Sequence, residues 1–333
     1  MKSFLILINS FLKKFYDRIA RNTLINSEDL SFYRIFTGFF FLLNLPSYSW
    51  IGSIPKSFYK PSPLLITSFL GSFPDPWFFA TLDLLIVLLL IIFTLGIRTR
   101  ITSMILFSVL IIANSFAYSL GKIDHLIFSS LIFLLMAVSN SGIKYALFPD
   151  KPTSFHRYTS AIFAICLAFA FLTAGYGKAF GWIDFDLTTS GINDWFYRIY
   201  FNGYSNRFLA DHFFHTPAWI TEILDYTAVI FEISGFIFLV WSRKTWFFYL
   251  FLATLFHLSN VLILNIPFTS HFIVYGLWLL APIIRKYKIL FLVLSPLLFF
   301  KGLSIILYLW LVMIFLSILS YKKAIYNFDK VNN

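Results

Sequence analysis

The sequence predicts an all-α integral membrane protein, a polytopic helical bundle of about 9–10 transmembrane helices preceded by an amphipathic helix at the membrane interface. Three observations predict this class. Of the 333 residues, 59% are hydrophobic and only 12% are charged, whereas a typical soluble domain has about 25% charged residues. The mean hydropathy is +0.80, and several apolar runs approach the about 20 residues that cross a bilayer. A soluble enzyme, a disordered chain and a disulfide scaffold are therefore excluded.

The net charge of +11 indicates orientation in a membrane and does not point to nucleic acid. With ten spans and a cytoplasmic N-terminus, most of the lysines and arginines fall in segments that face the cytoplasm. Basic residues are enriched in such segments by the positive-inside rule. We therefore expect a multi-pass protein of the cell (inner) membrane with both termini in the cytoplasm. Its expected partner is the lipid bilayer, and we expect no nucleic-acid partner.

The N-terminal segment, residues 1–30, has the pattern of an amphipathic helix that lies in the membrane interface. No small-residue cleavage site follows its apolar run, as a signal peptide would require. Apolar side chains recur at helical spacing with basic residues around them, namely Phe4, Ile8, Phe11, Phe15 and Ile19 with Lys13, Lys14, Arg18 and Arg21.

The main transmembrane domain is expected over residues 31–285. Its apolar runs lie at about 31–49, 77–97, 101–120, 124–141, 158–177, 219–241, 245–264 and 268–284. The last segment, residues 286–333, is expected to form a hydrophobic hairpin or one broken helix with a basic tail. Both alternatives stay open because Lys301 and Gly302 interrupt the apolar stretch 289–319.

Polar side chains within the spans are expected to gather toward the outside. Ionisable groups in a bilayer are costly and usually face a cavity, the bundle interior or one another. From the predicted orientation, eight polar residues from six spans share the outer leaflet and indicate an outward-facing pocket: Asp83, Asn114, Asp124, His125, Lys178, His257, Asn260 and His271. The long loop that follows Lys178, about residues 178–218, is rich in aromatic residues and is expected at the outer interface or over the bundle mouth.

Several of these residues also have a structural interpretation. Lys178 could be a lysine that extends its amine to the interface, and His125 could simply begin a helix. His257 could hydrogen-bond between helices, and Asn114 with Asp83 could serve packing. A separate pair, Arg34 and Glu232, lies at similar depth toward the cytoplasmic side, and we expect a buried structural ion pair there.

Proton abstraction is the chemistry that these residue types suit best. The histidines lack the spacing that puts two metal ligands on one helix, so no metal is predicted. No phosphate-binding loop or nucleophile elbow occurs. A desolvated lysine amine, in contrast, can act as a base. An apolar cavity in a bilayer suits a lipid-soluble substrate such as a quinol.

A family resemblance supports the same chemistry. One segment is Gly175-Tyr176-Gly177-Lys178-Ala179-Phe180-Gly181-Trp182. It resembles the lysine-plus-tryptophan motif of the vitamin K-dependent gamma-carboxylase superfamily. The bacterial members of this superfamily carry a horizontally transferred transmembrane (HTTM) domain. Three other stretches resemble the family in the same order over about residues 30–285, namely Tyr33-Arg34-Ile35, Gly121 to His125, and Phe256-His257-Leu258-Ser259-Asn260.

The resemblance implies a carboxylase-like enzyme of the carbon–carbon lyase class with a site on the outer side. Lys178 would deprotonate a reduced quinone similar to vitamin K hydroquinone, with O2 and CO2 as co-substrates. The candidate catalytic residues are Lys178, His125 and His257. The candidate substrate- and cofactor-binding residues are Asp124, Trp182, Asn260, His271 and Asn114. The alternatives are a non-enzymatic lipid or quinone binder, a partner in the maturation of a secreted peptide or toxin, and, less favoured, a transporter.

Overall fold

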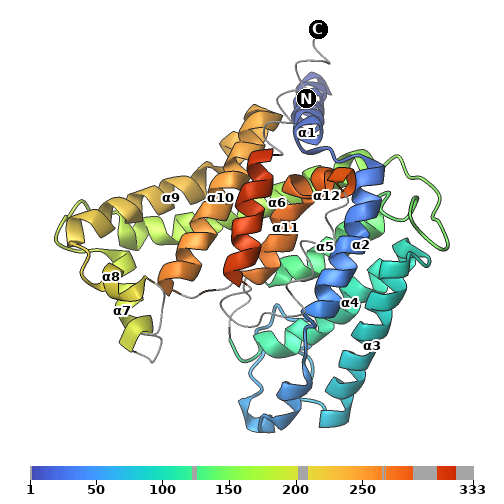
Figure 1. Cartoon of the computed structure of the whole chain (residues 1–333), viewed down its shortest axis with the longest axis horizontal. Helices are drawn as coiled ribbons and strands as arrows, with labels where there is room; N and C mark the ends of the chain where they lie inside the picture. The colour runs from blue at the N-terminus through green and yellow to red at the C-terminus, as the bar shows by residue number, and fades with distance from the viewer. Residues whose placement is uncertain are drawn as a thin grey trace. The chain divides into compact units, whose positions relative to one another are not determined.

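The computed structural model describes residues 2–121, 126–201, 209–264, 266, 268–287 and 306–319. Every regular element within these ranges is a helix (Figure 1), which confirms the all-α class. Five of the described helices are long and apolar enough to cross a membrane. They are α3 (Pro76–Leu95), α4 (Thr99–Tyr118), α6 (His156–Trp182), α9 (Ala218–Trp241) and α10 (Arg243–Leu264). A helical protein embedded in a membrane is therefore supported, and the total of about 9–10 spans stays a prediction.

The remaining expected spans give shorter helices. They are α2 (Ser27–Leu43), α5 (Ile127–Val138), and α11 (Thr269–Leu279) with α12 (Ala281–Tyr287). The run expected at 268–284 is divided at Leu280, two residues before Pro282, because proline lacks the N–H group that continues a helix. The final stretch includes an apolar helix at Ile306–Leu319. Residues 288–305 lie outside the described ranges, so the choice between one and two spans stays open.

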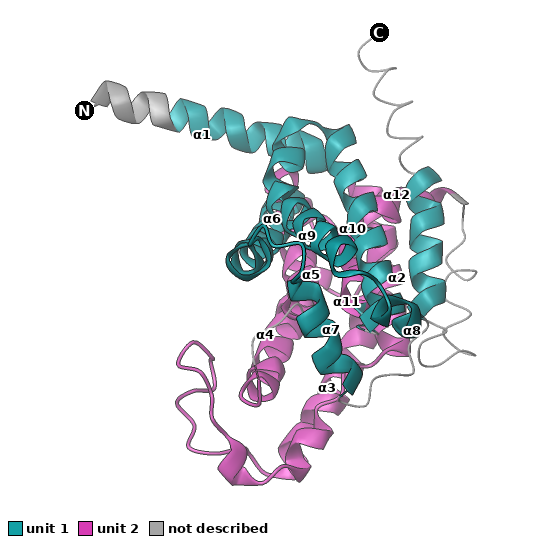
Figure 2. Ribbon diagram, turned by 90° about the vertical axis from the view of Figure 1, so that its left-hand side faces the viewer, with its two compact units in different colours: residues 1–24, 160–268, 301–333 teal, residues 25–159, 269–300 magenta. Residues whose placement is uncertain are grey.

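The chain forms two compact units, coloured separately in Figure 2. Unit 1 combines Met1–Leu24, Ser160–Phe268 and Lys301–Asn333, and unit 2 combines Ile25–Thr159 with Thr269–Phe300. Each unit thus joins stretches that are distant in the sequence. The linear segments 1–30, 31–285 and 286–333 stay a prediction about sequence organisation.

Unit 1 is built around the antiparallel helices α9 and α10. Helix α1 (Lys2–Thr23) confirms the helix predicted at the N-terminus, and its last turns pack against both. Ile19 is fully buried there. Asn22 Nδ2 donates to the Leu239 carbonyl at 2.9 Å, and Arg243 Nη1 donates to the Leu24 carbonyl at 2.7 Å. The short helices α7 (Gly191–Phe201) and α8 (Ala210–Phe214) pack on α9 and α10 respectively.

Unit 2 contains α2 to α5 with α11 and α12. Helices α2 and α3 pack closely because a Cβ on Gly38 would lie only 2.0 Å from Thr94 Oγ1. The chain then reverses into α4 at Gly96, whose φ of 74° favours glycine. Two short 3₁₀ turns, η1 (Ser49–Ser53) and η2 (Lys56–Phe58), follow α2.

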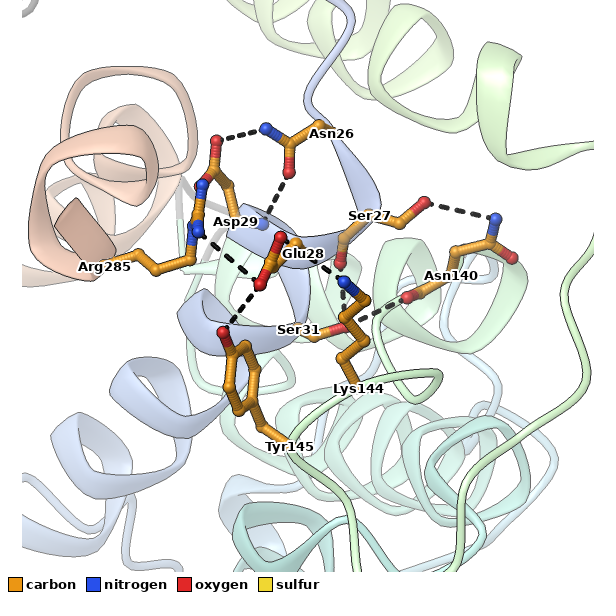
Figure 3. A network of polar contacts seen from close by, with 9 residues as sticks. All are labelled: Asn26, Ser27, Glu28, Asp29, Ser31, Asn140, Lys144, Tyr145 and Arg285. Atoms are coloured by element: carbon orange, nitrogen blue, oxygen red, sulfur yellow. Dashed lines mark hydrogen bonds and ion pairs between the residues drawn. The ribbon is translucent and has the colours of Figure 1, made fainter.

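A polar network covers the start of α2 (Figure 3). The side chain of Asn26 caps the helix by accepting from the Asp29 N–H at 2.7 Å. Arg285, at the end of α12, forms ion pairs with Asp29 and with Glu28. Glu28 also contacts Lys144 at 3.4 Å and accepts from the Tyr145 hydroxyl at 2.8 Å. The network therefore joins three separate stretches of unit 2.

Candidate functional site

The candidate site in unit 1 is built where α6 meets α9. At Gly175, a Cβ would lie 2.8 Å from Glu232 Cβ and 3.0 Å from Ile233 Cγ1. Glycine therefore permits the two helices to approach here. Lys178 follows Gly175 by three residues on α6, so its side chain projects from nearly the same helix face. The close approach brings its amine within reach of Glu232.

Lys178 and Glu232 form an ion pair between Nζ and Oε1. The Lys178 side chain is 28% exposed and that of Glu232 only 4%. The amine lies 5.1 Å from the centre of the Trp182 ring and 5.8 Å from that of Phe256. Such geometry gives cation–π attraction in addition to the ion pair. Because α6 continues to Trp182, the expected spacing of Lys178 and Trp182 along one helix is confirmed.

The second carboxylate oxygen of Glu232, Oε2, is buried, and no described residue provides it with a hydrogen-bond donor. The hydroxyl of Tyr249, on α10, is likewise buried without a partner in the described ranges. It packs on α9 at Gly235, where a Cβ would lie 2.9 Å from Tyr249 Oη. Buried polar atoms are normally hydrogen-bonded, because a buried donor or acceptor without a hydrogen bond costs about 1–3 kcal/mol of stability. The described residues thus leave the hydrogen bonds of Glu232 Oε2 and Tyr249 Oη unmade.

Aromatic rings surround this charged pair. Phe171 packs edge-on against Tyr249, with ring centres 5.6 Å apart, and Phe231 stacks on Tyr249 at 4.9 Å. Phe256 packs on Phe231 at 5.2 Å. Rings from α6, α9 and α10 thus make the surroundings of the pair largely apolar. In low-dielectric surroundings the interactions of a charged pair are stronger than in water.

His257 belongs to the same surroundings. It is buried on α10, with ring centres 6.1 Å from Phe171 and 4.2 Å from Phe268. Asn260 follows three residues later on the same helix, as expected, and is half-buried. Phe256 links His257 to the pair, because its ring centre lies 5.5 Å from that of His257 and 5.8 Å from the Lys178 amine.

The expected ion pair between Arg34 and Glu232 stays a prediction, because the two residues lie in different units. Within unit 1, the charge partner of Glu232 is Lys178. Arg34, in unit 2, donates from Nη1 to Thr99 Oγ1 at 3.0 Å and from Nη2 to the carbonyl of Tyr145. Sequence position placed Glu232 nearer to Arg34 in depth. The close approach at Gly175, which extends the reach of Lys178, was the missing information.

Other candidate residues lie in unit 2. Asn114 accepts from the Tyr48 hydroxyl at 2.7 Å and donates to Ser130 Oγ at 3.0 Å. Both contacts are between protein groups, in agreement with the structural interpretation. His271 is buried on α11, with its ring centre 6.1 Å from that of Phe128 and 5.5 Å from that of Tyr275.

Asp83 also has a structural role in unit 2. Its carboxylate accepts from the backbone N–H of Tyr48 at 2.7 Å and of Ser49 at 3.0 Å, which holds the chain after α2. Asp124 and His125 lie outside the described residues. Because the candidates are divided between the two units, their convergence on one pocket stays a prediction.

A polar cavity of about 390 Å³ lies beyond Lys178, at the end of α6 in unit 1. The loop after α6 and the first turn of α7 contribute two carboxylates, Asp184 and Asp194, and several hydroxyl groups to its lining. Gly191 joins the cavity wall to the ion-pair site, since a Cβ there would overlap the Trp182 ring. Hydrogen bonds from Thr188 lower the pKa of the nearby Asp186. The sequence predicted the aromatic character of this loop but gave no role to its aspartate and threonine residues.

In comparison with known proteins, no family model, curated protein or solved structure matches this chain. The distinctive parts of the site are the Lys178–Glu232 pair, the unpartnered Glu232 oxygen and the surrounding rings. Neither the pairing of Glu232 with Lys178 nor the buried hydroxyl of Tyr249 had been expected.

Proposed function

We propose that the chain is a membrane enzyme that deprotonates a reduced quinone at the Lys178–Glu232 pair, with chemistry similar to the carboxylase superfamily. The observation that carries the proposal is the buried Oε2 atom of Glu232, which has no donor among the described residues. A quinol hydroxyl is a donor of the kind that this atom lacks. The resemblance around Lys178 supports the same substrate class.

The ion pair changes the role that we assign to Lys178. An amine bonded to a carboxylate favours its charged ammonium form, whereas a base must be neutral. We therefore assign proton acceptance to Glu232, whose Oε2 takes the proton of the quinol hydroxyl. The electron pair that remains on the quinol oxygen lies beside the Lys178 ammonium, which stabilises its negative charge.

The surroundings suit a flat, lipid-soluble substrate. Trp182 and Phe256 already lie against the Lys178 amine, and an aromatic substrate ring can stack on such side chains. His257 is close enough to the surrounding rings to be retained as a candidate catalytic residue. O2 and CO2 remain the proposed co-substrates: O2 oxidises the deprotonated quinol to the epoxide and water, and CO2 adds to a carbanion formed on a secreted peptide or protein substrate. The proposed site faces the outer side of the cell membrane.

A turnover assay tests this function. The protein in lipid nanodiscs would receive vitamin K hydroquinone with O2 and CO2, and quinone epoxide would be measured by mass spectrometry. We expect Glu232→Gln to lower the rate about 100-fold or more, because general-base groups contribute about 10²–10⁴-fold. Lys178→Met should also lower it strongly.

Asp29→Asn is the matched control, because it neutralises another buried carboxylate that pairs with a basic residue. It should leave the rate per folded molecule unchanged. A Glu232→Gln variant with the wild-type rate would remove Glu232 from the proposed role. Absence of turnover with any quinol would contradict the enzymatic proposal as a whole.

A second candidate function is a partner in the maturation of a secreted peptide. The polar cavity favours it, because two aspartates and several hydroxyls suit a ligand with positive charge and hydrogen-bonding groups. Photo-crosslinking from position 194 in intact cells distinguishes the two. One cross-linked peptide without quinol turnover would favour the partner function, and turnover without cross-linking would favour the enzyme.

A further inference from the structure

Arg34 in unit 2 is a buried charge with unusual partners. Arg34 belongs to α2, and its side chain has no exposed surface. Its two terminal nitrogens donate to a threonine hydroxyl, Thr99 Oγ1, and to the carbonyl of Tyr145. Both acceptors are neutral. A buried charge is costly unless an opposite charge accompanies it.

The described part of the chain shows no carboxylate in ion-pair contact with Arg34. Asp150 acts on the guanidinium through its charge, but its Oδ2 accepts from the Arg100 backbone N–H at 2.9 Å. The remaining donor of Arg34, Nε, is buried, and none of the described residues accepts from it. The guanidinium therefore retains a free donor and lacks a direct counter-charge.

Helices α2 and α4 carry further polar groups about one turn beyond Arg34 and Thr99. Two contacts fix their register: Arg34 bonds to Thr99, and Tyr48, beyond the end of α2, bonds to Asn114 near the end of α4. Helices α2 and α4 therefore run in the same direction. Thr37 lies three residues after Arg34, and Ser103 lies four residues after Thr99. At 1.5 Å per residue, both are about one turn further along, at nearly the same level.

Thr37 Oγ1 and Ser103 Oγ, like Arg34 Nε, are buried polar atoms that none of the described residues bonds. Both residues are fully buried, and neither hydroxyl has a hydrogen-bond partner within the described ranges. A threonine or serine in a helix often donates to a backbone carbonyl of its own helix. These two do not, so their donors are available for another group.

We propose that Arg34, Thr37 and Ser103 bind a small inorganic anion inside unit 2. The positive charge of Arg34 disfavours a cation at this position. Its Nε–H and the two hydroxyls are three available donors, which is what a halide or a small oxyanion requires. Such an anion provides a counter-charge in direct contact with Arg34, which its neutral partners Thr99 and Tyr145 do not supply. The site is independent of the Lys178–Glu232 pair.

Chloride is the probe for the test. The full chain in a non-ionic detergent would be titrated with chloride, and the excess width of the ³⁵Cl NMR signal would give the affinity. We expect Thr37→Val and Ser103→Ala each to weaken chloride binding about tenfold, as expected for loss of a hydrogen bond to a charged group. Bicarbonate added as a competitor shows whether the site also takes a small oxyanion.

Thr67→Val is the matched control. Thr67 is also a buried threonine of unit 2 whose hydroxyl has no partner among the described residues, but it lies in the loop before α3. The Thr67→Val variant should bind chloride with the affinity of the wild type. These variants retain Arg34, so the test does not depend on folding without that residue. Equal affinity in all three variants, or no excess width for the wild type, would overturn the proposal.

Discussion

Charged pairs in the two units differ in what surrounds them. In unit 2, Glu28 is shared by Arg285, Lys144 and Tyr145, and its side chain is 34% exposed (Figure 3). In unit 1, the only basic partner of Glu232 among the described residues is Lys178, and the Glu232 side chain is 4% exposed. Water screens the first set of charges, whereas aromatic rings surround the second.

The difference separates a structural role from a functional one. Every oxygen of the Glu28 side chain contacts a donor, and the network connects the start of α2 with the loop at Tyr145 and the end of α12. Such a network stabilises the fold without need of another molecule. The Lys178–Glu232 pair leaves Oε2 without a donor from the described residues. A costly, incompletely satisfied pair in a membrane protein is a candidate for function.

The largest expected effect on stability is that of Lys178→Met. It leaves the Glu232 carboxylate buried without its counter-charge, which costs about 3–5 kcal/mol when a buried pair is broken. Unfolding in mixed detergent micelles measures the loss. The double variant Lys178→Met/Glu232→Leu should recover most of it. Lys144→Met, at a lysine that is 54% exposed, should change the free energy of unfolding by at most about 1 kcal/mol; equal effects at the two lysines would contradict the comparison.

A smaller effect is expected for Asp29→Asn in unit 2. This substitution removes the charge that Arg285 contacts but retains the shape of the side chain. We expect a loss of about 1–3 kcal/mol in the free energy of unfolding, because a hydrogen bond to a charged group contributes about this much. The same unfolding experiment measures it. A loss as large as that of Lys178→Met would mean that the two regions do not differ in the way described.

The smallest effect is a pH dependence from Glu28. The hydrogen bond from the Tyr145 hydroxyl is the main cause that holds the pKa of Glu28 below its ordinary value of 4.5, and the charges of Arg285 and Lys144 lower it further. A lowered pKa in the folded state gives stability that is complete above pH 4.5 and is lost as the pH falls through the folded value. From pH 6 to about pH 3, the melting temperature of the wild type should therefore fall more than that of Glu28→Gln. Parallel curves would contradict this assignment.

The sequence predicted the fold best where the apolar runs are uninterrupted. The helices α3, α4, α6, α9 and α10 coincide with predicted spans because their length and composition alone suit a bilayer. The N-terminal helix was also predicted, from the spacing of its apolar residues. The run at 268–284 gave two short helices, since the effect of Pro282 on the backbone is local and apolar composition does not reveal it.

The site was predicted only in part. Lys178 and Trp182 could be identified because they lie one turn apart on one helix. The partner of Lys178 could not, because counting residues along each span gives depth and not the place where two helices approach. Gly175 was the available signal, a residue without a side chain one turn before the lysine. The unpartnered atoms of Glu232 and Tyr249 depend on packing in three dimensions.

The most direct test of the functional claim is to measure the mass of any small molecule that stays bound to the purified protein. Native mass spectrometry of the wild type, extracted from its membrane in mild detergent, should show a bound quinone. Glu232→Gln should lose this adduct, and Asp29→Asn should retain it, because only the first residue belongs to the proposed site. A wild type without a quinone, or equal retention by the two variants, would contradict a quinol site at Lys178 and Glu232.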